Sequence, residues 1–416
     1  MKYLKYGAIT ILSMVLWTGF VSLGRNYGFL LQSIVSSESE TKFIEAVKEN
    51  IQSEHVGNMA IALVKNGDIK SAFYYSKGNP VDEKTLFQMA SVSKWVTAWG
   101  IFKLVEQNKL SLDEPISTYL TRWKLPKSDF DNEKVTVRNL LSHTAGLTDG
   151  LGYDGFDSNQ AIQSIEESLH KAADAEPYVS GITKVGIEPN TEFRYSGGGY
   201  TLLQLVIEEV SGITFQEYMT KYVFQPLKMK HSTFELNATS NLAQSYKMDG
   251  TLDKHYRYTA LSAASLYTCI EDLTLFLQAN GIDNPVLSKS TQEMMNAEVI
   301  GMNKYLSHAL GPFVYSKNTT GDYVIGHDGN NRAAINTSVR VNTSTNDGVI
   351  ILESGNPNLA TRLGDEWVFW KTGILNHTVL NSNRKNIFYW LIGGNVLILG
   401  LSILLFVKKR RTALIS

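Results

Sequence analysis

The sequence predicts an α+β protein in which an antiparallel sheet is flanked by helices and joined to an all-helical subdomain. Three observations lead to this prediction. Strand-like segments occur only near the two ends of the central region of the chain. A helical and loop-rich stretch separates these two groups of segments. Apolar runs at the N- and C-terminal ends of the chain flank the central region. With 416 residues, 43% of them hydrophobic, the chain can build one large core. We expect this domain over residues 38–375, with the helical subdomain at about 110–280.

The first part of the sheet is predicted by a hairpin signal. The apolar segment Met59–Val64 is followed by Lys-Asn-Gly-Asp and then by the strand-like segment Ile69–Tyr75. Asn-Gly between two such segments is the strongest short hairpin signal. An amphipathic helix is expected before the hairpin, from about Glu38 to Ser53.

The second part of the sheet is expected after residue 300. The segments that resemble strands there are Tyr305–Tyr315, Tyr323–Ile325, Ala333–Val339 and Gly348–Leu352. A final helix from about Asn358 to Trp370 should pack on the completed sheet.

A serine and a lysine stand at the start of a predicted helix from about Ser91 to Gln107, which apolar residues at helical spacing indicate. Residues three apart share a helix face, so the side chains of Ser91 and Lys94 can meet. The helix N-terminus favours developing negative charge. A serine hydroxyl is a poor nucleophile until a base takes its proton, and Lys94 would be that base. Ser91 is the predicted nucleophile.

The same Ser-x-x-Lys spacing also arises by chance in a chain of this length. A second copy, Ser39 to Lys42, lies in a polar run with no strand before it and a weaker apolar pattern after it. The surroundings therefore favour the copy at Ser91.

Both ends of the chain carry apolar runs. Lys2 and Lys5 precede an apolar run that ends near Gly24, so residues 1–24 are either a signal peptide or a signal anchor. The charge-free run 387–407 is long enough for a transmembrane helix, and a basic tail follows at 408–416. By the positive-inside rule both ends are cytoplasmic, which puts the domain between them in the periplasm or outside the cell.

Composition narrows the classes of partner. The formal net charge of −1 gives no case for a nucleic-acid partner. A single cysteine, Cys269, excludes an internal disulfide framework, and the eight histidines show no spacing typical of metal ligands. We therefore expect no metal and no organic cofactor. The expected partners are a small-molecule or peptide substrate and membrane lipid around the C-terminal helix, while protein partners, including one bound through the membrane helix, stay open.

Five segments carry a resemblance. They are Ala90-Ser-Val-Ser-Lys94, Leu140-Leu-Ser-His-Thr-Ala-Gly-Leu147, Phe193-Arg-Tyr-Ser-Gly-Gly-Gly-Tyr200, Gln225-Pro-Leu-Lys-Met229 and Gly326-His-Asp-Gly329. In this order, over about 44–370, the chain resembles the β-lactamase-related serine hydrolases, which include class C β-lactamases, D,D-carboxypeptidases, D-aminopeptidases and carboxylesterases. The resemblance implies the β-lactamase/transpeptidase-like fold.

The resemblance also implies roles for residues in the first two family motifs. Ser91 and Lys94 match the nucleophile and its lysine, and Tyr195 matches the tyrosine of Tyr-x-Asn. Lys94 and Tyr195 would pass a proton between Ser91 and the leaving group. Gly197 replaces the usual asparagine, which weakens the case for a β-lactamase, although the glycines could let backbone approach the substrate.

The third family motif is matched by His327-Asp328-Gly329, just beyond a predicted strand. Gly329 would let a ligand lie against the edge strand, and the N–H of Asn330 would be the second oxyanion donor beside that of Ser91. His327 would support the leaving group or a substrate carboxylate. His143 is expected to be a structural imidazole, and the stretch 148–186, the least family-like part, should form a lid or wall of the substrate site.

The predicted function is that of a membrane-anchored serine hydrolase that forms an acyl-serine intermediate. Its substrates would be amides or peptides, including those with D-amino acids, or esters. A β-lactamase is one alternative. A non-catalytic penicillin-binding or sensor module is another, which the retained Ser91, Lys94 and Tyr195 and the short basic tail disfavour.

Overall fold

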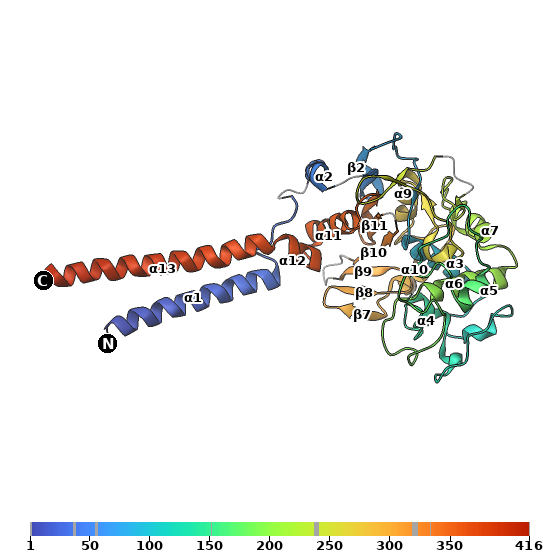
Figure 1. Cartoon of the computed structure of the whole chain (residues 1–416), viewed down its shortest axis with the longest axis horizontal. Coiled ribbons are helices and arrows are strands. Elements are labelled where there is room, and N and C mark those ends of the chain that lie inside the picture. Colours follow the sequence, from blue (N-terminus) through green and yellow to red (C-terminus); the bar gives the residue numbers. More distant parts are fainter. Residues whose placement is uncertain are drawn as a thin grey trace. The chain divides into compact units, whose positions relative to one another are not determined.

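The computed structural model describes residues 2–35, 39–54, 57–150, 152–236, 241–317, 323–332 and 334–415. The predicted limits Met1, Glu38, Ala333 and Ser416 lie outside these residues. The chain divides into two compact units, Ser39–Trp367 and a second one formed by Met1–Glu38 with Val368–Ser416 (Figure 1).

The larger unit is built on a mostly buried antiparallel sheet. Among the described residues it has eight strands, in the order β2 (Asp68–Tyr75), β1 (Met59–Lys65), β12 (Asp347–Glu353), β11 (Ile335–Asn342), β10 (Tyr323–Asn331), β9 (Phe313–Lys317), β8 (Leu306–His308) and β7 (Ile300–Asn303). Two small pairs stand apart, β3 (Phe87–Gln88) with β6 (Tyr267–Thr268) and β4 (Ser245–Tyr246) with β5 (Leu252–Asp253). The sheet is thus assembled from both ends of the unit, as predicted.

The helices of this unit are α2 (Glu40–Glu54), α3 (Val92–Glu106), α4 (Val137–Leu141), α5 (Ile165–His170), α6 (Gly197–Ser211), α7 (Phe215–Met219), α8 (Leu261–Ala264), α9 (Ile270–Gln278), α10 (Lys289–Asn296) and most of α11 (Leu359–Thr372). Short 3₁₀ turns occupy Ile116–Thr118 and Asn132–Lys134, and a π-helical turn occupies Thr220–Phe224.

The hairpin forms because Asn66 and Gly67 both adopt positive φ, 52° and 88°, which a tight turn between twisted strands requires. β1 then pairs with β12 from Met59 opposite Glu353 to Val64 opposite Gly348. Residues almost three hundred positions apart therefore lie side by side in the sheet.

Two expectations about the second half of the sheet are corrected. β10 does not end at Ile325 but continues to Asn331, because the polar residues after Ile325 pair with β11. The segment 305–315 is not one strand: β8 and β9 are separate, and Pro312 accepts a turn hydrogen bond between them. β7 was not anticipated.

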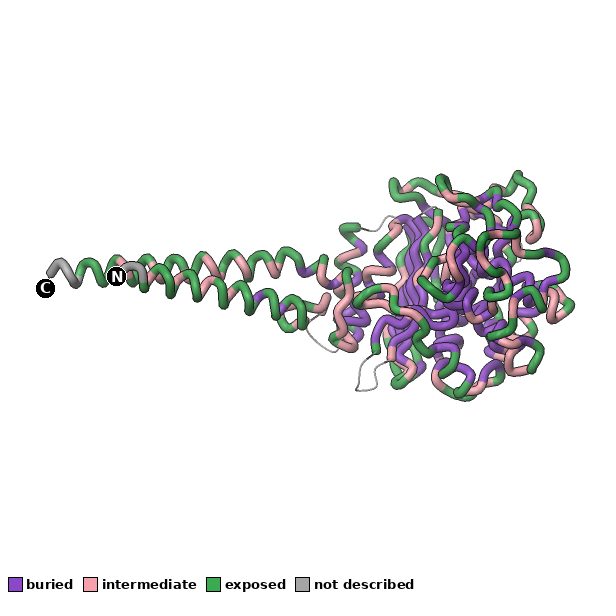
Figure 2. Tube along the Cα trace, turned by 90° about the horizontal axis from the view of Figure 1, so that it is seen from below, coloured by how far each residue is buried: buried purple, intermediate pink, exposed green. Residues whose placement is uncertain are grey.

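α3 is more deeply buried than the predicted amphipathic pattern requires. All its residues are buried except Lys103, Val105 and Glu106, because the helix contacts β10 and β11 as well as α6 and α8. Figure 2 shows buried chain gathered in the sheet and in the segments that cover it. The helix that begins after Ser91 thus occupies the centre of the core.

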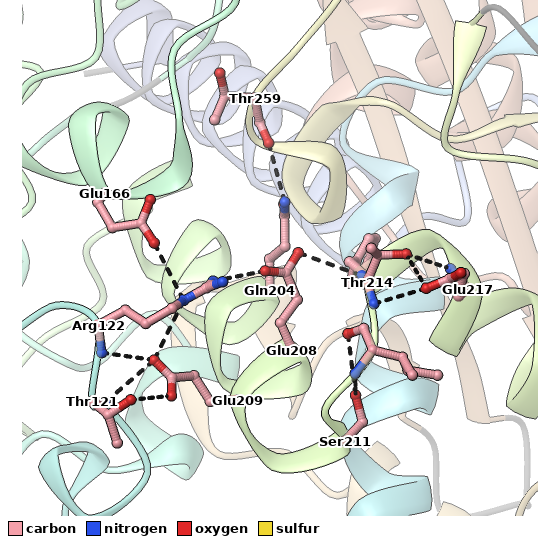
Figure 3. A network of polar contacts seen from close by, with 12 residues as sticks. Thr121, Arg122, Glu166, Gln204, Glu208, Glu209, Ser211, Thr214, Glu217 and Thr259 are labelled. Carbon is pink, nitrogen blue, oxygen red and sulfur yellow. Dashed lines mark hydrogen bonds and ion pairs between the residues drawn. The ribbon is translucent and has the colours of Figure 1, made fainter.

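A network of ion pairs and hydrogen bonds links α5 and α6 through Arg122. Arg122 forms ion pairs with Glu166 in α5 at 3.2 Å and with Glu208 in α6 at 2.7 Å, as Figure 3 shows. Glu209 also accepts a hydrogen bond from the Thr121 hydroxyl at 2.6 Å. Exposed ion pairs contribute little each, about 0–1 kcal/mol, so the network mainly fixes how α5 and α6 meet.

The second unit contains α1 (Lys2–Tyr27), α12 (His377–Ser382) and α13 (Arg384–Ile415). Two stretches in it, Lys5–Tyr27 and Arg384–Arg411, are long and apolar enough to cross a membrane. The stretch between α11 and α13 is partly helical, since it contains α12.

Candidate functional site

A strained turn presents Ser91 at the start of α3. Ala90, the residue before it, has a positive φ of 47°, which costs free energy in a residue with a Cβ. Ser93 holds this turn in place: its hydroxyl donates to the Ala90 carbonyl at 2.6 Å and accepts from the Leu266 N–H at 2.9 Å. Ser93, the second serine of Ser-Val-Ser-Lys, thus fixes the backbone that carries Ser91.

The three predicted catalytic side chains meet at one point. Lys94 Nζ lies 3.2 Å from Ser91 Oγ, and the Tyr195 hydroxyl lies 2.9 Å from the same oxygen. Lys94 is buried, donates a second hydrogen bond to the Ala263 carbonyl at 2.8 Å, and lies 4.9 Å from the centre of the Tyr195 ring. The geometry brings Ser91, Lys94 and Tyr195 together, while their catalytic roles stay predictions.

His143 positions the loop that carries Tyr195. Its carbonyl accepts from the Arg194 N–H at 2.8 Å and its Nδ1 accepts from the Ser196 N–H at 3.1 Å. The imidazole also packs against the Tyr195 ring, with 4.4 Å between ring centres. These contacts agree with the structural imidazole expected from the sequence.

Gly197 lies elsewhere than expected. It is the first residue of α6, and it is not among the described residues that line the cavity. The glycine run instead lets this helix start close to buried Asp149, which accepts from the Ser196 hydroxyl at 2.6 Å and from the Gly198 N–H at 2.9 Å. Sequence reasoning missed Asp149, because only the folded chain brings it to the N-terminus of α6. A role for Gly197 in substrate binding stays a prediction.

The third motif lies within β10 rather than beyond it. Over this part β10 pairs with β11 only, since β9 pairs no further than Gly326. A Cβ added to Gly329 would lie 2.1 Å from the Met89 carbonyl, so this glycine is needed where β10 packs against the turn before Ser91. This packing is a further reason for the glycine besides the predicted approach of a ligand. Asn330 lines the same cavity as Ser91, and its part as an oxyanion donor stays a prediction.

Asp328 is bound to a buried guanidinium. Arg340 in β11 is fully buried and contacts the Asp328 carboxylate at 2.9 and 3.1 Å and Asp365 in α11 at 2.6 Å. Its guanidinium carbon also lies 3.8 Å from the centre of the Tyr315 ring. These contacts join β9, β10 and β11 to α11 beside the cavity.

Three histidines near Lys94 are buried and neutral. Burial, with a smaller contribution from the Lys94 charge, lowers the pKa of His308 to about 4 and the pKa of His327 well below its usual range. The pKa of His143 is lowered in the same direction, first by burial. His327 Nδ1 donates to the Asp328 carbonyl at 2.6 Å, so its other nitrogen carries no proton. His327 is therefore a neutral acceptor and not a cation that could bind a substrate carboxylate.

A cavity of about 470 Å³ opens beside the three predicted catalytic side chains. It is lined by Ser91, Gly150, Gly152, Glu176, Tyr195, Leu306, Phe313, Tyr315, His327, Asp328, Gly329 and Asn330. The stretch 148–186, expected to wall the substrate site, supplies three of these residues. No group of histidine, cysteine and acidic side chains among the described residues has the geometry of a metal site.

The chain matches the family model described as Beta-lactamase over residues 43–370. Among curated proteins it is similar to Protein flp of Staphylococcus aureus (strain MW2), with 24% identity over 361 residues that cover 82% of this chain and 68% of that protein. It is 30% identical over 206 residues to penicillin-binding protein 4* of Bacillus subtilis (strain 168), covering 47% of this chain and 42% of the other.

Solved structures give the same picture. An octameric penicillin-binding protein homologue from Pyrococcus abyssi matches with a TM-score of 0.66 and 25% identity, covering 80% of this chain and 77% of that one. A β-lactamase/D-alanine carboxypeptidase from Pseudomonas syringae matches with a TM-score of 0.63 and 18% identity, covering 81% and 98%. The fold is therefore the β-lactamase/transpeptidase-like fold that the motifs implied. The chain belongs to the β-lactamase family.

Proposed function

We propose that this protein is a serine hydrolase that acts through an ester on Ser91. The observation that carries the proposal is the meeting of Lys94 Nζ and the Tyr195 hydroxyl at Ser91 Oγ, beside a cavity large enough for a small substrate. A nucleophile within hydrogen-bond distance of two proton-transfer groups is the arrangement that covalent hydrolysis needs.

The proposed reaction has two steps. Ser91 Oγ attacks the substrate carbonyl while its proton passes to Lys94 or Tyr195, whichever is then deprotonated, and from there to the leaving amine or alcohol. The N–H groups of Ser91 and Asn330 would stabilise the negative oxygen. Water then attacks the ester and gives one proton to Lys94 or Tyr195, and that proton passes to Ser91 Oγ as the acid product leaves. The relatives named for penicillin binding and D-alanine carboxypeptidase activity support amide, peptide or ester substrates, including those with D-residues.

Covalent labelling tests this proposal. We expect a fluorescent fluorophosphonate to add one label per molecule, on the peptide that contains Ser91, and Ser91→Ala to abolish that label. Ser93→Ala is an unsuitable control because Ser93 holds the turn, so Ser117→Ala, an exposed hydroxyl in a 3₁₀ turn, serves instead. A labelled penicillin, run in parallel, reports whether β-lactams also acylate the site. A folded wild-type protein that neither probe labels would exclude the hydrolase reading.

We also propose that α13 anchors the protein in a membrane, with the larger unit outside the cytoplasm, and that α1 is a retained signal anchor that pairs with α13. In α13, apolar side chains such as Leu397 and Leu404 are more than 60% exposed, as expected for lipid-facing residues. Along α1 the contacts run from Tyr6 beside Lys409 to Thr18 beside Asn395, so the helices are antiparallel. Both basic ends then lie on one side, in agreement with the positive-inside rule.

The packing between the two helices is specific. Trp17 donates from its indole N–H to the Trp390 carbonyl at 2.9 Å, and a Cβ added to Gly394 would lie 1.9 Å from that indole nitrogen. Close approach at a glycine is typical of helices that associate in a bilayer. This close packing supports the proposal that α1 stays beside α13.

A cysteine pair tests whether α1 is retained. We expect Thr18→Cys with Asn395→Cys to form an intramolecular disulfide in membranes under mild oxidation, because these side chains touch. Leu12→Cys with Leu404→Cys, two exposed side chains, is the control pair and should not cross-link. The only native cysteine, Cys269, is buried. A mature protein whose mass lacks the first 27 residues would contradict the proposal.

A further inference from the structure

Glu176 places a carboxylate at the wall of the cavity that contains Ser91. Its N–H donates to the Gly152 carbonyl at 3.1 Å, which ties two parts of the same long loop together. Its side chain then lies over Gly152, where a Cβ would come within 1.8 Å of Oε1. The glycine thus makes room for the carboxylate, which stays exposed.

The Glu176 carboxylate has no binding partner among the described residues. The structure gives it no ion pair and no hydrogen bond from any residue that it describes. The other acid in the cavity wall, Asp328, is already held in an ion pair with buried Arg340. Glu176 is therefore the carboxylate there whose charge remains available to a bound molecule.

The cavity wall offers no cation among the described residues that line it. His327 of the third motif is held neutral by burial. Lys94 lies behind Ser91 and is bound to Ser91 and to the Ala263 carbonyl. A substrate carboxylate would therefore meet uncompensated negative charge, whereas a substrate cation would be attracted.

We propose that the site selects substrates that carry an ammonium or similar cationic group, with Glu176 as the counter-charge. This inference rests on the proposed function and names its substrate class. Leu306, Phe313 and Tyr315 form an apolar wall of the same cavity, so the preferred substrate joins an apolar portion to the cation. Aromatic ring faces also attract cations, which favours the same substrates.

The experiment uses three matched series of 4-nitrophenyl esters with acyl chains of graded length. One series ends in an ammonium group, one in the same amine after acetylation, and one in a carboxylate. At low ionic strength we expect kcat/KM for the best ammonium ester to exceed that of its acetylated partner by about 10- to 100-fold, the range of a charge-assisted contact. The carboxylate ester should be the poorest substrate.

Substitutions test whether Glu176 causes the preference for the ammonium esters. Glu176→Gln should bring the ratio of ammonium to acetylated ester close to one, and Glu176→Lys should favour the carboxylate series. Glu45→Gln, the same change at an exposed position in α2, should leave the ratio unchanged. Fluorophosphonate labelling of Ser91 runs beside each assay, because it needs no cation. Normal labelling with equal turnover of the ammonium and acetylated esters would overturn this inference and leave the hydrolase intact. Absence of both labelling and turnover would overturn the proposed function and this inference with it.

Discussion

Replacing Lys94 by methionine is expected to lower the rate of acylation of Ser91 by about 10²- to 10⁴-fold, the usual contribution of a positioned proton-transfer group. Methionine keeps the length and most of the volume of the buried stem, so α3 should still pack. What it removes is the nitrogen 3.2 Å from Ser91 Oγ. The measurement is the second-order rate constant of fluorophosphonate labelling.

Lys103→Met is the matched control for this variant. Lys103 belongs to the same helix and also donates to a carbonyl, that of Val286 at 2.8 Å, but it does not contact Ser91. The control loses a comparable hydrogen bond and should keep its labelling rate. If Lys94→Met folds with an unchanged melting temperature and labels within about threefold of wild type, a threshold far inside the range expected of a proton-transfer group, Lys94 is not the base.

Replacing Arg340 by methionine is expected to lower the free energy of unfolding by about 3–5 kcal/mol. Arg340 is fully buried between Asp328 and Asp365, whose side chains are 24% and 15% exposed, and removing it leaves two largely buried carboxylates without this cation. Urea unfolding of the full-length protein in detergent measures the loss. Because β10 carries Asp328 into the cavity, weaker labelling of Ser91 should accompany it.

Two further variants test why Arg340→Met lowers the free energy of unfolding. Adding Asp328→Asn and Asp365→Asn to Arg340→Met should restore most of the stability, since the stranded charges are then gone. Arg138→Met breaks an ion pair with Asp113 in which the side chains are 35% and 67% exposed, and it should cost only about 1 kcal/mol. A loss at Arg340 no larger than the loss at Arg138 would show that the buried network is not what holds β10.

The sequence predicted the parts of the fold that depend on local chemistry. The Asn-Gly turn identified the first hairpin, and the assembly of the sheet from two distant segments followed from where strand-like residues occur. It did not predict the full length of β10, because His-Asp-Gly-Asn-Asn is typical of a turn. In the folded chain Arg340 compensates the polar character of this segment by binding Asp328.

Some residues of the candidate site could also be predicted from the sequence, and others could not. Ser91 and Lys94 could be paired from helical spacing alone, and Tyr195 was added by the resemblance; the structure brings all three together. Asp149 and Glu176 could not be anticipated, since each acts through a loop whose path depends on contacts far away in the sequence. The only signals for them were glycines nearby, Gly198 and Gly152, which make room for their carboxylates.

The pairing of β1 with β12 has a consequence for how the protein is made. A chain synthesised from its N-terminus exposes the edge of β1 opposite β2 until residues 347–353 emerge, because β12 is the strand that pairs with that edge. Loop closure over so many residues is slow. The turn that carries Ser91 can therefore reach its final surroundings only after nearly the whole unit has been translated. The surroundings of Ser91 are thus expected to form late in synthesis, after the strands that follow residue 300 are available.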